Sequence, residues 1–85
     1  TWWVYMVRCS DNSLYTGITT DTVRRTREHN KSSRGAAYTR ARRPVTLVYR
    51  VAVDSRSAAC SMEYSLKALN KKQKEAIVGG ASHAK

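Results

Sequence analysis

The N-terminal segment carries the pattern of a β-hairpin, and this pattern limits the possible folds more than any other feature. Trp2 to Cys9 (WWVYMVRC) is rich in aromatic and β-branched side chains, and Leu14 to Ile18 (LYTGI) follows the turn-forming cluster Ser10-Asp11-Asn12-Ser13. The chain has 85 residues, and a chain this short buries only about 60% of the surface that its unfolded form exposes. We therefore expect one domain with a thin core, in which the hairpin supplies two strands.

A polar helix and a basic loop are predicted next. Thr20 or Asp21 can cap a helix that runs to about Asn30, whose only strongly apolar residue is Val23. Residues 31–43 (KSSRGAAYTRARR) combine Ser, Gly and five basic residues with a single aromatic one, so we expect a loop with at most one helical turn. The charge of this loop must face solvent or phosphate.

A third strand and a strongly amphipathic helix follow. The segment Val45 to Val53 (VTLVYRVAV) has the length and the Val and Tyr content of a central strand, and Pro44 is tolerated at its start. A helix is predicted to begin at Asp54 and Ser55. Its buried face is expected at residues that recur with helical spacing, namely Ala58, Met62, Leu66 and Leu69.

The chain is expected to finish with a shorter helix, Lys71 to Val78, which Gly79-Gly80 ends. The domain would then span residues 1–78, and residues 79–85 would form a flexible tail. The resulting order is β-β-α-β-α-α, an α+β fold in which helices cover a small three-stranded sheet. The pattern leaves open whether the third strand pairs in the middle of the sheet or at an edge.

The charge of the chain favours a polyanionic partner. Sixteen Lys and Arg residues against six Asp and Glu give a formal net charge of +10, as in many nucleic-acid binders. No stretch resembles a membrane span or a membrane-binding helix, so we expect a soluble, cytoplasmic protein, by default a monomer. Cys9 and Cys60 lie far apart without a CxxC or Cys/His cluster, so they are expected to be reduced core residues rather than zinc ligands or a disulfide.

Several motifs of the chain, in their order, resemble those of the GIY-YIG nuclease superfamily. They are the tripeptides Val4-Tyr5-Met6 and Tyr15-Thr16-Gly17, the segment Val23 to His29, and Glu63. The stretches LYTGITTDTVRRTREHN and YTRARRP, and the helix that contains Glu63, look like the small stand-alone bacterial YhbQ-like branch. The similarity covers nearly the whole chain, and the combination is far more specific than either tripeptide alone.

The resemblance implies both a fold and a reaction. The fold would be a three-stranded antiparallel sheet flanked by helices. The reaction would be hydrolysis of a nucleic-acid backbone, with DNA favoured over RNA, by a water molecule activated with the help of one Mg²⁺ or Mn²⁺ ion. Structure-selective cutting in DNA repair or recombination is the expected role, and a protein partner that supplies specificity is a further expectation.

Two tyrosines are the first candidate catalytic residues. Tyr5 and Tyr15 fall on neighbouring strands of the predicted hairpin, where odd-numbered positions share a face if no bulge intervenes. By resemblance, Tyr5 helps to activate the attacking water as a general base near the metal, and Tyr15 positions water or phosphate. The alternative is that both tyrosines only pack, with their hydroxyl groups in solvent.

Arg25 and His29 are the candidates from the first helix. They are four residues apart and so project from one side of it. An arginine fork suits a phosphate whose charge grows in the transition state, and the resemblance gives His29 three possible roles: orienting water, binding phosphate or relaying a proton. The alternative is a solvated basic face of the helix.

Glu63 is the candidate metal ligand. It lies at the edge of the buried face of its helix, where one carboxylate can ligate a hard cation that keeps several waters. The alternative is a surface ion pair with Lys67, four residues on, worth about 0.3 to 0.5 kcal/mol. The serines and Cys60 lack a neighbouring base, so no covalent intermediate is predicted.

A second group of residues is expected to contact nucleic acid. Gly17 has no Cβ and lets its backbone approach another chain segment or a phosphate, although an ordinary bulge would also explain it. The basic loop would dock the backbone, with Tyr38 stacking on a base, unless it is merely a solvated charge run. The predicted nucleic-acid-binding residues are Gly17, Arg24, Arg27, Arg34, Tyr38, Arg40, Arg42 and Arg43.

Departures from the family pattern motivate a second hypothesis. Ile18 stands where many members carry Lys, Thr26 replaces a usual leucine, and Asn70 lies too close to Glu63 to match the late asparagine of the family. The alternative function is therefore a catalytically weak or inactive DNA- or RNA-binding module with the same fold. A basic structural partner in a ribonucleoprotein is a third reading.

Overall fold

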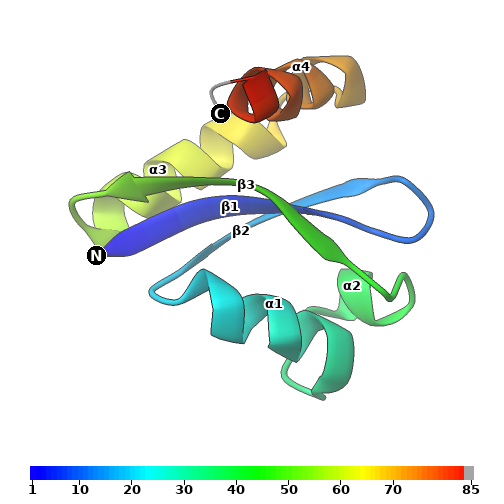
Figure 1. Ribbon diagram of the computed structural model, residues 1–85. Coiled ribbons are helices and arrows are strands. Elements are labelled where there is room, and N and C mark those ends of the chain that lie inside the picture. Colours follow the sequence, from blue (N-terminus) through cyan, green and yellow to red (C-terminus); the bar gives the residue numbers. More distant parts are fainter. Residues whose placement is uncertain (84–85) are drawn as a thin grey trace.

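The computed structural model of the chain describes residues 1–83, with the side chains described up to residue 80. Along the chain, the elements are β1 (Trp2–Arg8), β2 (Leu14–Thr19), α1 (Thr22–Lys31), α2 (Ala37–Arg40), β3 (Thr46–Val53), α3 (Arg56–Lys67) and α4 (Lys71–His83) (Figure 1). This order confirms the predicted α+β arrangement, with α2 as the single turn expected in the basic loop. None of the described helices is long and apolar enough to span a membrane.

The three strands form one antiparallel sheet in the order β2-β1-β3, which confirms the predicted sheet. In the turn between β1 and β2, Asn12 adopts a positive φ of 69°, a conformation that asparagine tolerates. The pattern left the place of the third strand open, and the structure puts β3 at an edge, with β1 between the other two. Four successive β1 residues, 4–7, are buried, whereas half-buried and exposed residues alternate along most of β3. Helices therefore cover both faces of β1.

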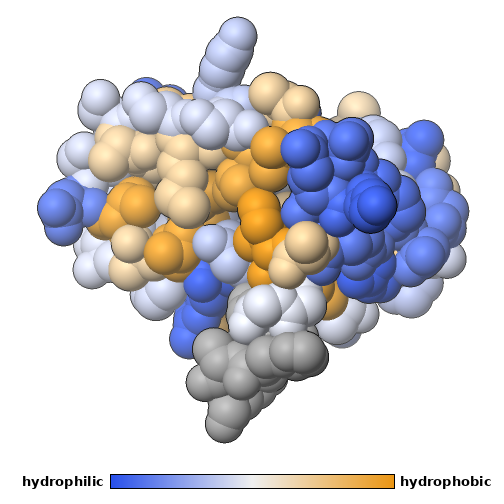
Figure 2. Space-filling model, turned by 90° about the horizontal axis from the view of Figure 1, so that it is seen from above, coloured by the Kyte–Doolittle hydropathy of each residue, from blue (hydrophilic) through white to orange (hydrophobic). Residues whose placement is uncertain are grey.

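The helices divide between the two faces of the sheet, as Figure 1 shows with α1 and α2 below it and α3 and α4 above. Odd-numbered β1 residues, Tyr5 and Val7, pack with Cys9 and Val45 on the α1 side. Even-numbered residues contact the other pair of helices: Val4 packs with Ala59 and Leu66 of α3, and Met6 with Leu14 and Val78. Seen from the α4 side, apolar atoms remain visible among hydrophilic ones (Figure 2), as expected of a thin core.

Helix starts follow the predicted capping chemistry, with one correction on the buried face. Asp21 accepts a hydrogen bond from the backbone of Arg24, and Ser55 accepts one from the backbone of Ala58. The expectation that Ala58 is buried is wrong: Ala58 is exposed and Ala59 is fully buried. In the first turn of α3, the buried face is therefore shifted by one residue from the predicted one, where the helix packs against Val4. Cys9 is a buried thiol as predicted, and Cys60 is half-buried.

The predicted end of the last helix at Gly79-Gly80 is also wrong, because α4 continues to His83. Neither glycine has a positive φ, the conformation that would make it a helix stop. The helix is held by its earlier residues: Val78 is buried in the core, and both nitrogens of the Arg8 fork donate to Glu75 at 2.7 Å. Residues 84–85 of the predicted flexible tail lie outside the described residues.

We expect Gly79→Ala to raise the free energy of unfolding by about 0.5 to 1 kcal/mol, because alanine in a helix interior loses less backbone entropy than glycine. No atom lies within 4 Å of a Cβ added at Gly79, so the substitution meets no clash. Urea denaturation of the two proteins measures the difference. A less stable variant would show that the chain leaves the helix at this residue.

Candidate active site

The two tyrosines face the same side of the sheet, as their odd numbering predicted. Across the β1–β2 pair, Tyr5 lies opposite Gly17, and Val7 lies opposite Tyr15, with no bulge between them. The imidazole of His29, from α1, sits against both phenol rings, with ring centroids 5.8 Å from Tyr5 and 5.3 Å from Tyr15. The fold therefore gathers three of the predicted catalytic side chains between β1, β2 and α1.

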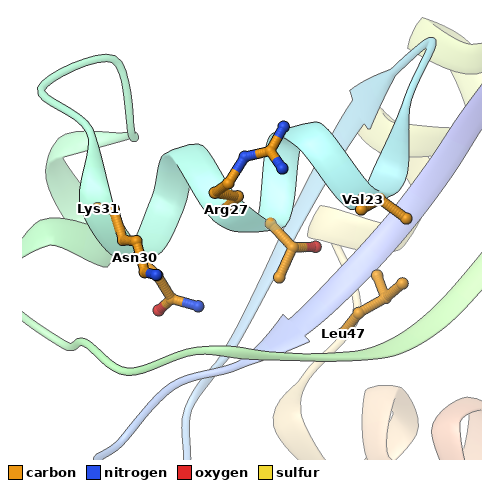
Figure 3. Close-up of a pocket in the computed structure, with 6 residues that line it drawn as sticks. Val23, Arg27, Asn30, Lys31 and Leu47 are labelled. Carbon is orange, nitrogen blue, oxygen red and sulfur yellow. The ribbon is translucent and has the colours of Figure 1, made fainter.

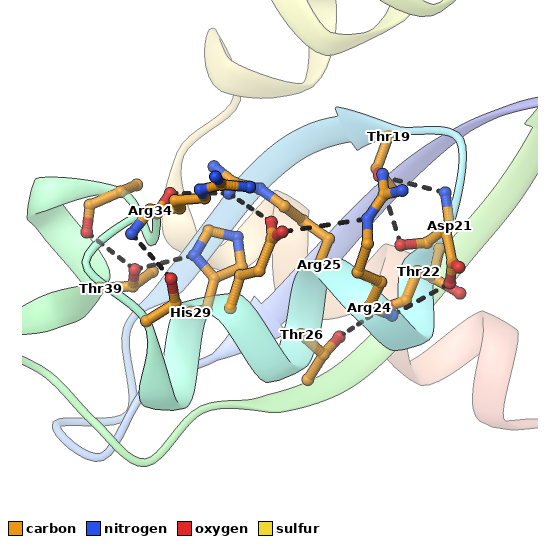
Figure 4. A network of polar contacts seen from close by, with 12 residues as sticks. Thr19, Asp21, Thr22, Arg24, Arg25, Thr26, His29, Arg34 and Thr39 are labelled. Carbon is orange, nitrogen blue, oxygen red and sulfur yellow. Dashed lines mark hydrogen bonds and ion pairs between the residues drawn. The ribbon is translucent and has the colours of Figure 1, made fainter.

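Both nitrogens of His29 are occupied by protein groups. Its Nε2 lies 2.6 Å from the Tyr5 hydroxyl. Its Nδ1 lies 2.8 Å from the Thr39 hydroxyl, as Figure 4 shows. His29 and Thr39 are both 0% exposed, and Tyr5 is 1% exposed. Of the three roles predicted for His29, this geometry favours exchange of a proton with Tyr5 over direct contact with phosphate or bulk water.

Burial keeps this pair uncharged at neutral pH. Burial raises the pKa of Tyr5 to about 12, although the nearby Arg25 guanidinium opposes this shift. Burial also lowers the pKa of His29 to about 4, and the positive charge of Arg25 adds to that effect. A neutral phenol and a neutral imidazole therefore share one short hydrogen bond.

Arg25 is held in place by its own segment of the chain. Its Nη1 donates to Glu28 at 3.0 Å and to the backbone carbonyl of Arg34 at 2.8 Å (Figure 4). The guanidinium lies close enough to Tyr5 to lower the pKa of the phenol against the effect of burial. Arg25 thus places a permanent positive charge beside the Tyr5–His29 pair.

Glu63 brings a carboxylate within electrostatic range of Tyr5. Although α3 packs on the opposite face from α1, the negative charge of Glu63 contributes to raising the pKa of Tyr5. Glu63 also makes the predicted alternative contact, an ion pair with Lys67 at 3.4 Å, and the Lys67 ammonium lies 5.7 Å from the Tyr15 ring centroid. Among the side chains that the structure describes, no three His, Cys, Asp or Glu residues cluster in a way that could hold a metal ion, so Glu63 would act as a single carboxylate ligand.

Gly17 is required by the position of Tyr5. A Cβ at residue 17 would lie 2.5 Å from the Tyr5 Oη and 2.8 Å from its Cζ, distances that no side chain tolerates. Gly17 was predicted to let another part of the molecule approach its backbone closely, and here that part is the phenol ring of Tyr5.

Three residues predicted to contact nucleic acid form a wall of the site through contacts within the protein. The Arg43 guanidinium donates to the backbone carbonyls of Glu28, His29 and Ser32 at the C-terminal end of α1. Arg42 donates to Asp11 and stacks 3.9 Å above the ring of Tyr38, whose plane also stacks on Tyr15 at 5.8 Å. A base that stacks on Tyr38 would compete with Arg42 for the ring.

The remaining predicted docking residues are exposed. Arg24 makes only a long ion pair with Glu28, at 3.9 Å, and the backbone carbonyl of Arg34 anchors Arg25. Arg27 lines a hollow of about 460 Å³ between α1 and β3, together with Val23 and Leu47 (Figure 3). The exposed arginines of the predicted set are Arg24, Arg27, Arg34 and Arg40.

Two residues of the site were missed in the sequence. Thr39 lies in a loop without periodicity, so no pattern marked its hydroxyl as a partner of His29. Arg50 is paired with Tyr5 across the β1–β3 ladder, donates to Thr22 at 3.2 Å and stacks 4.5 Å over the Trp3 ring. Arg50 is the one charged residue in the apolar sequence of β3, and this could have marked it as a candidate site residue.

Comparisons with known proteins agree with this fold. The family model described as the GIY-YIG catalytic domain matches residues 1–76. The UPF0213 protein DP2720 of Desulfotalea psychrophila is 53% identical over 77 residues, which cover 91% of this chain and 70% of that protein. The UPF0213 protein YhbQ of Salmonella arizonae is 46% identical over 77 residues, or 91% of this chain and 76% of the relative.

A solved structure extends the comparison to three dimensions. The NMR structure of the UPF0213 protein BH0048 from Bacillus halodurans is 44% identical and superimposes with a TM-score of 0.59, covering 92% of this chain and 82% of that one. The fold and the tyrosine-histidine cluster define a protein of the GIY-YIG nuclease class. The chain belongs to the GIY-YIG family and, within it, to the YhbQ-like UPF0213 branch.

We expect Gly17→Ala to lower the free energy of unfolding by about 1 to 3 kcal/mol, because the new methyl group overlaps the buried Tyr5 side chain. Thermal denaturation measures the loss. In a Tyr5→Phe background the same substitution should be less damaging, since the nearest clashing atom is gone. Equal stability of Gly17→Ala and the parent would contradict the packing described for Tyr5.

We expect the free energy of unfolding to fall as the pH is lowered from about 6.5 to about 4. His29 titrates near 6.5 in the unfolded chain and near 4 in the folded protein, so in this window only the unfolded chain takes up the proton. The loss attributable to His29 is roughly 3 kcal/mol. Urea denaturation at a series of pH values, compared with His29→Gln, measures it. A variant with the same pH slope as the parent would show that His29 is not buried in its neutral form.

Proposed function

We propose that this protein is a metal-dependent endonuclease that hydrolyses phosphodiester bonds of nucleic acid, with DNA the favoured substrate. Membership of a nuclease family supports the reaction class. The observation that carries the proposal is the hydrogen-bonded pair of Tyr5 and His29, neutral and buried, with the charges of Arg25 and Glu63 beside it. A packing tyrosine would need neither a buried histidine nor two opposite charges around its hydroxyl.

The attacking water would be activated by Tyr5. As the water attacks phosphorus, its proton passes to the Tyr5 oxygen while the Tyr5 proton passes to His29 Nε2, and the bond from phosphorus to the leaving oxygen breaks. A charged imidazolium is unfavourable here, because burial lowers the pKa of His29, so the proton would return through Tyr5 and reach the leaving oxygen through solvent water. Arg25 would offset the negative charge that grows on the phosphate.

The donor set fits a magnesium or manganese ion. Glu63 is half-buried and offers one carboxylate, which is enough for a hard cation that keeps several waters and takes further oxygens from the substrate phosphate. The ion, when bound, would supply positive charge to the phosphate and lower the pKa of a water. Glu63 would first have to separate from Lys67, whose exposed ammonium could then contact the phosphate near Tyr15.

The substrate surface would be the exposed arginines around the site. With a net charge of +10 and contacts mainly to the phosphate backbone, we expect binding without sequence choice and structure-selective cutting, in keeping with DNA repair or recombination. Arg50 and Trp3 would extend this surface along the sheet, because Arg50 lies beside Tyr5 on the same face.

A binding module without catalysis is the second candidate, and one observation favours it. Ile18 stands at the position where many family members carry Lys, and here its side chain packs in the apolar cluster around Val4. That position supplies no cation to the site. Among the described residues, Lys67 is the lysine whose ammonium lies over the Tyr15 ring, and its charge is already paired with Glu63.

We expect the purified protein to nick branched or single-stranded DNA when Mg²⁺ or Mn²⁺ is added, and Glu63→Gln to cut at least about 100-fold more slowly, because even groups that only support a metal ligand are worth 10- to 100-fold. Asp54→Asn is the matched control, since it removes the same charge from an exposed residue outside the site. Gel assays of labelled substrates give the rates.

Two results would count against the enzyme. Equal rates for Glu63→Gln and the control would reject the proposed metal ligand. Binding that weakens steeply with salt, without any cutting by the parent protein, would favour the second candidate.

A further inference from the structure

The hydroxyl group of Thr39 forms a second hydrogen bond that bears on the site. Its Oγ1 lies 2.8 Å from His29 Nδ1 and 2.9 Å from the backbone carbonyl oxygen of Ala36. Thr39 and His29 are both fully buried, so water does not compete for the contact between them, and the contact with Ala36 is partly buried. Four groups therefore form one continuous chain: Tyr5 hydroxyl, His29 imidazole, Thr39 hydroxyl and Ala36 carbonyl.

The carbonyl group at the end sets the direction of this chain. A carbonyl oxygen only accepts hydrogen bonds, so the contact with Ala36 is a hydrogen bond only if the Thr39 hydroxyl donates its single hydrogen there. The Thr39 oxygen is then an acceptor toward His29, and Nδ1 must carry the proton. A neutral imidazole has one N–H, so Nε2 is left as an acceptor and the Tyr5 hydroxyl donates to it.

The opposite arrangement makes fewer hydrogen bonds. If Nε2 carried the proton, it would donate to the Tyr5 oxygen, and Thr39 would have to donate to Nδ1 instead of Ala36. The Tyr5 hydrogen would then lose its acceptor, His29 Nε2, in a residue that is only 1% exposed. A buried donor without a partner is costly, so the first arrangement is favoured.

We propose that Thr39 is a positioning residue that fixes His29 as the Nδ1–H tautomer and thereby makes Nε2 the acceptor of the Tyr5 proton. The catalytic consequence rests on the proposed nuclease function. With this tautomer, the Tyr5 oxygen keeps a lone pair for the proton of an attacking water, and its own proton has a base to receive it. With the other tautomer, Tyr5 would accept a hydrogen bond from His29 and could pass no proton to it.

Nitrogen NMR of the imidazole tests the tautomer without any assay of activity. The chain has two histidines, so ¹⁵N-histidine labelling of a His83→Gln variant leaves His29 as the one labelled ring. At pH 7.5 we expect long-range ¹H–¹⁵N correlations of a neutral ring with Nδ1 protonated and Nε2 unprotonated. A ring protonated at Nε2, or one that averages between the two tautomers, would overturn the proposal.

Two substitutions at Thr39 separate hydrogen bonding from packing. Thr39→Val keeps the shape but removes the oxygen, and Thr39→Ser keeps the hydroxyl but removes the methyl group. We expect Val to shift the ring away from the Nδ1–H form and to slow cleavage by about tenfold or more, and Ser to retain both properties. If Thr39 only packs, Val would behave like the parent and Ser would be the impaired variant, which would reject the proposal.

The two proposals can fail separately. An Nδ1–H ring that is lost in Thr39→Val supports the role of Thr39 even if no substrate is cut, and the nuclease proposal alone would then fail. Cleavage by a protein whose His29 is protonated at Nε2 would leave the nuclease proposal standing and overturn the assignment of Thr39.

Discussion

The buried hydrogen bond between Tyr5 and His29 is the interaction on which the rest of the site depends. Two polar rings are placed between a sheet and a helix, where each donor and acceptor needs a partner. Gly17 leaves the space for the phenol, and Thr39 satisfies the far side of the imidazole. Residues from β1, β2, α1 and α2 are therefore set by one polar contact, and the thin apolar core alone would not specify their arrangement.

The charges of the site come from both layers of helices that flank the sheet. Burial keeps Tyr5 and His29 neutral, while Arg25 and Glu63 stay partly exposed on opposite layers of the fold. Tyr15 lies on the edge strand β2, and there the Lys67 ammonium of α3 lies 5.7 Å from its ring centroid. Tyr5 lies on the central strand β1, where the Glu63 carboxylate acts on it through its charge.

The parts of this structure that follow a periodic pattern were predictable from the sequence, and those that depend on a single contact were not. The alternation of a strand correctly placed Tyr5 and Tyr15 on one face, and capping chemistry located the starts of α1 and α3. The end of α4 was mispredicted because Gly79-Gly80 reads as a stop, whereas packing of Val78 carries the helix past it. Thr39 has no pattern at all, since its role depends on a histidine ten residues away that folding brings beside it.

Net charge overstates how much of this surface is free to bind a polyanion. Arg43 donates to backbone carbonyls at the end of α1. Arg42 donates to Asp11 in the hairpin turn and stacks on Tyr38. These two cations therefore stabilise the wall of the site. Both guanidinium groups are already engaged with carbonyl, carboxylate or aromatic partners, and contact with a phosphate would disturb those bonds. The same loop therefore has two kinds of arginine, and burial separates them: half-buried Arg42 and Arg43 support the fold, while exposed Arg34 and Arg40 remain accessible to a nucleic-acid backbone.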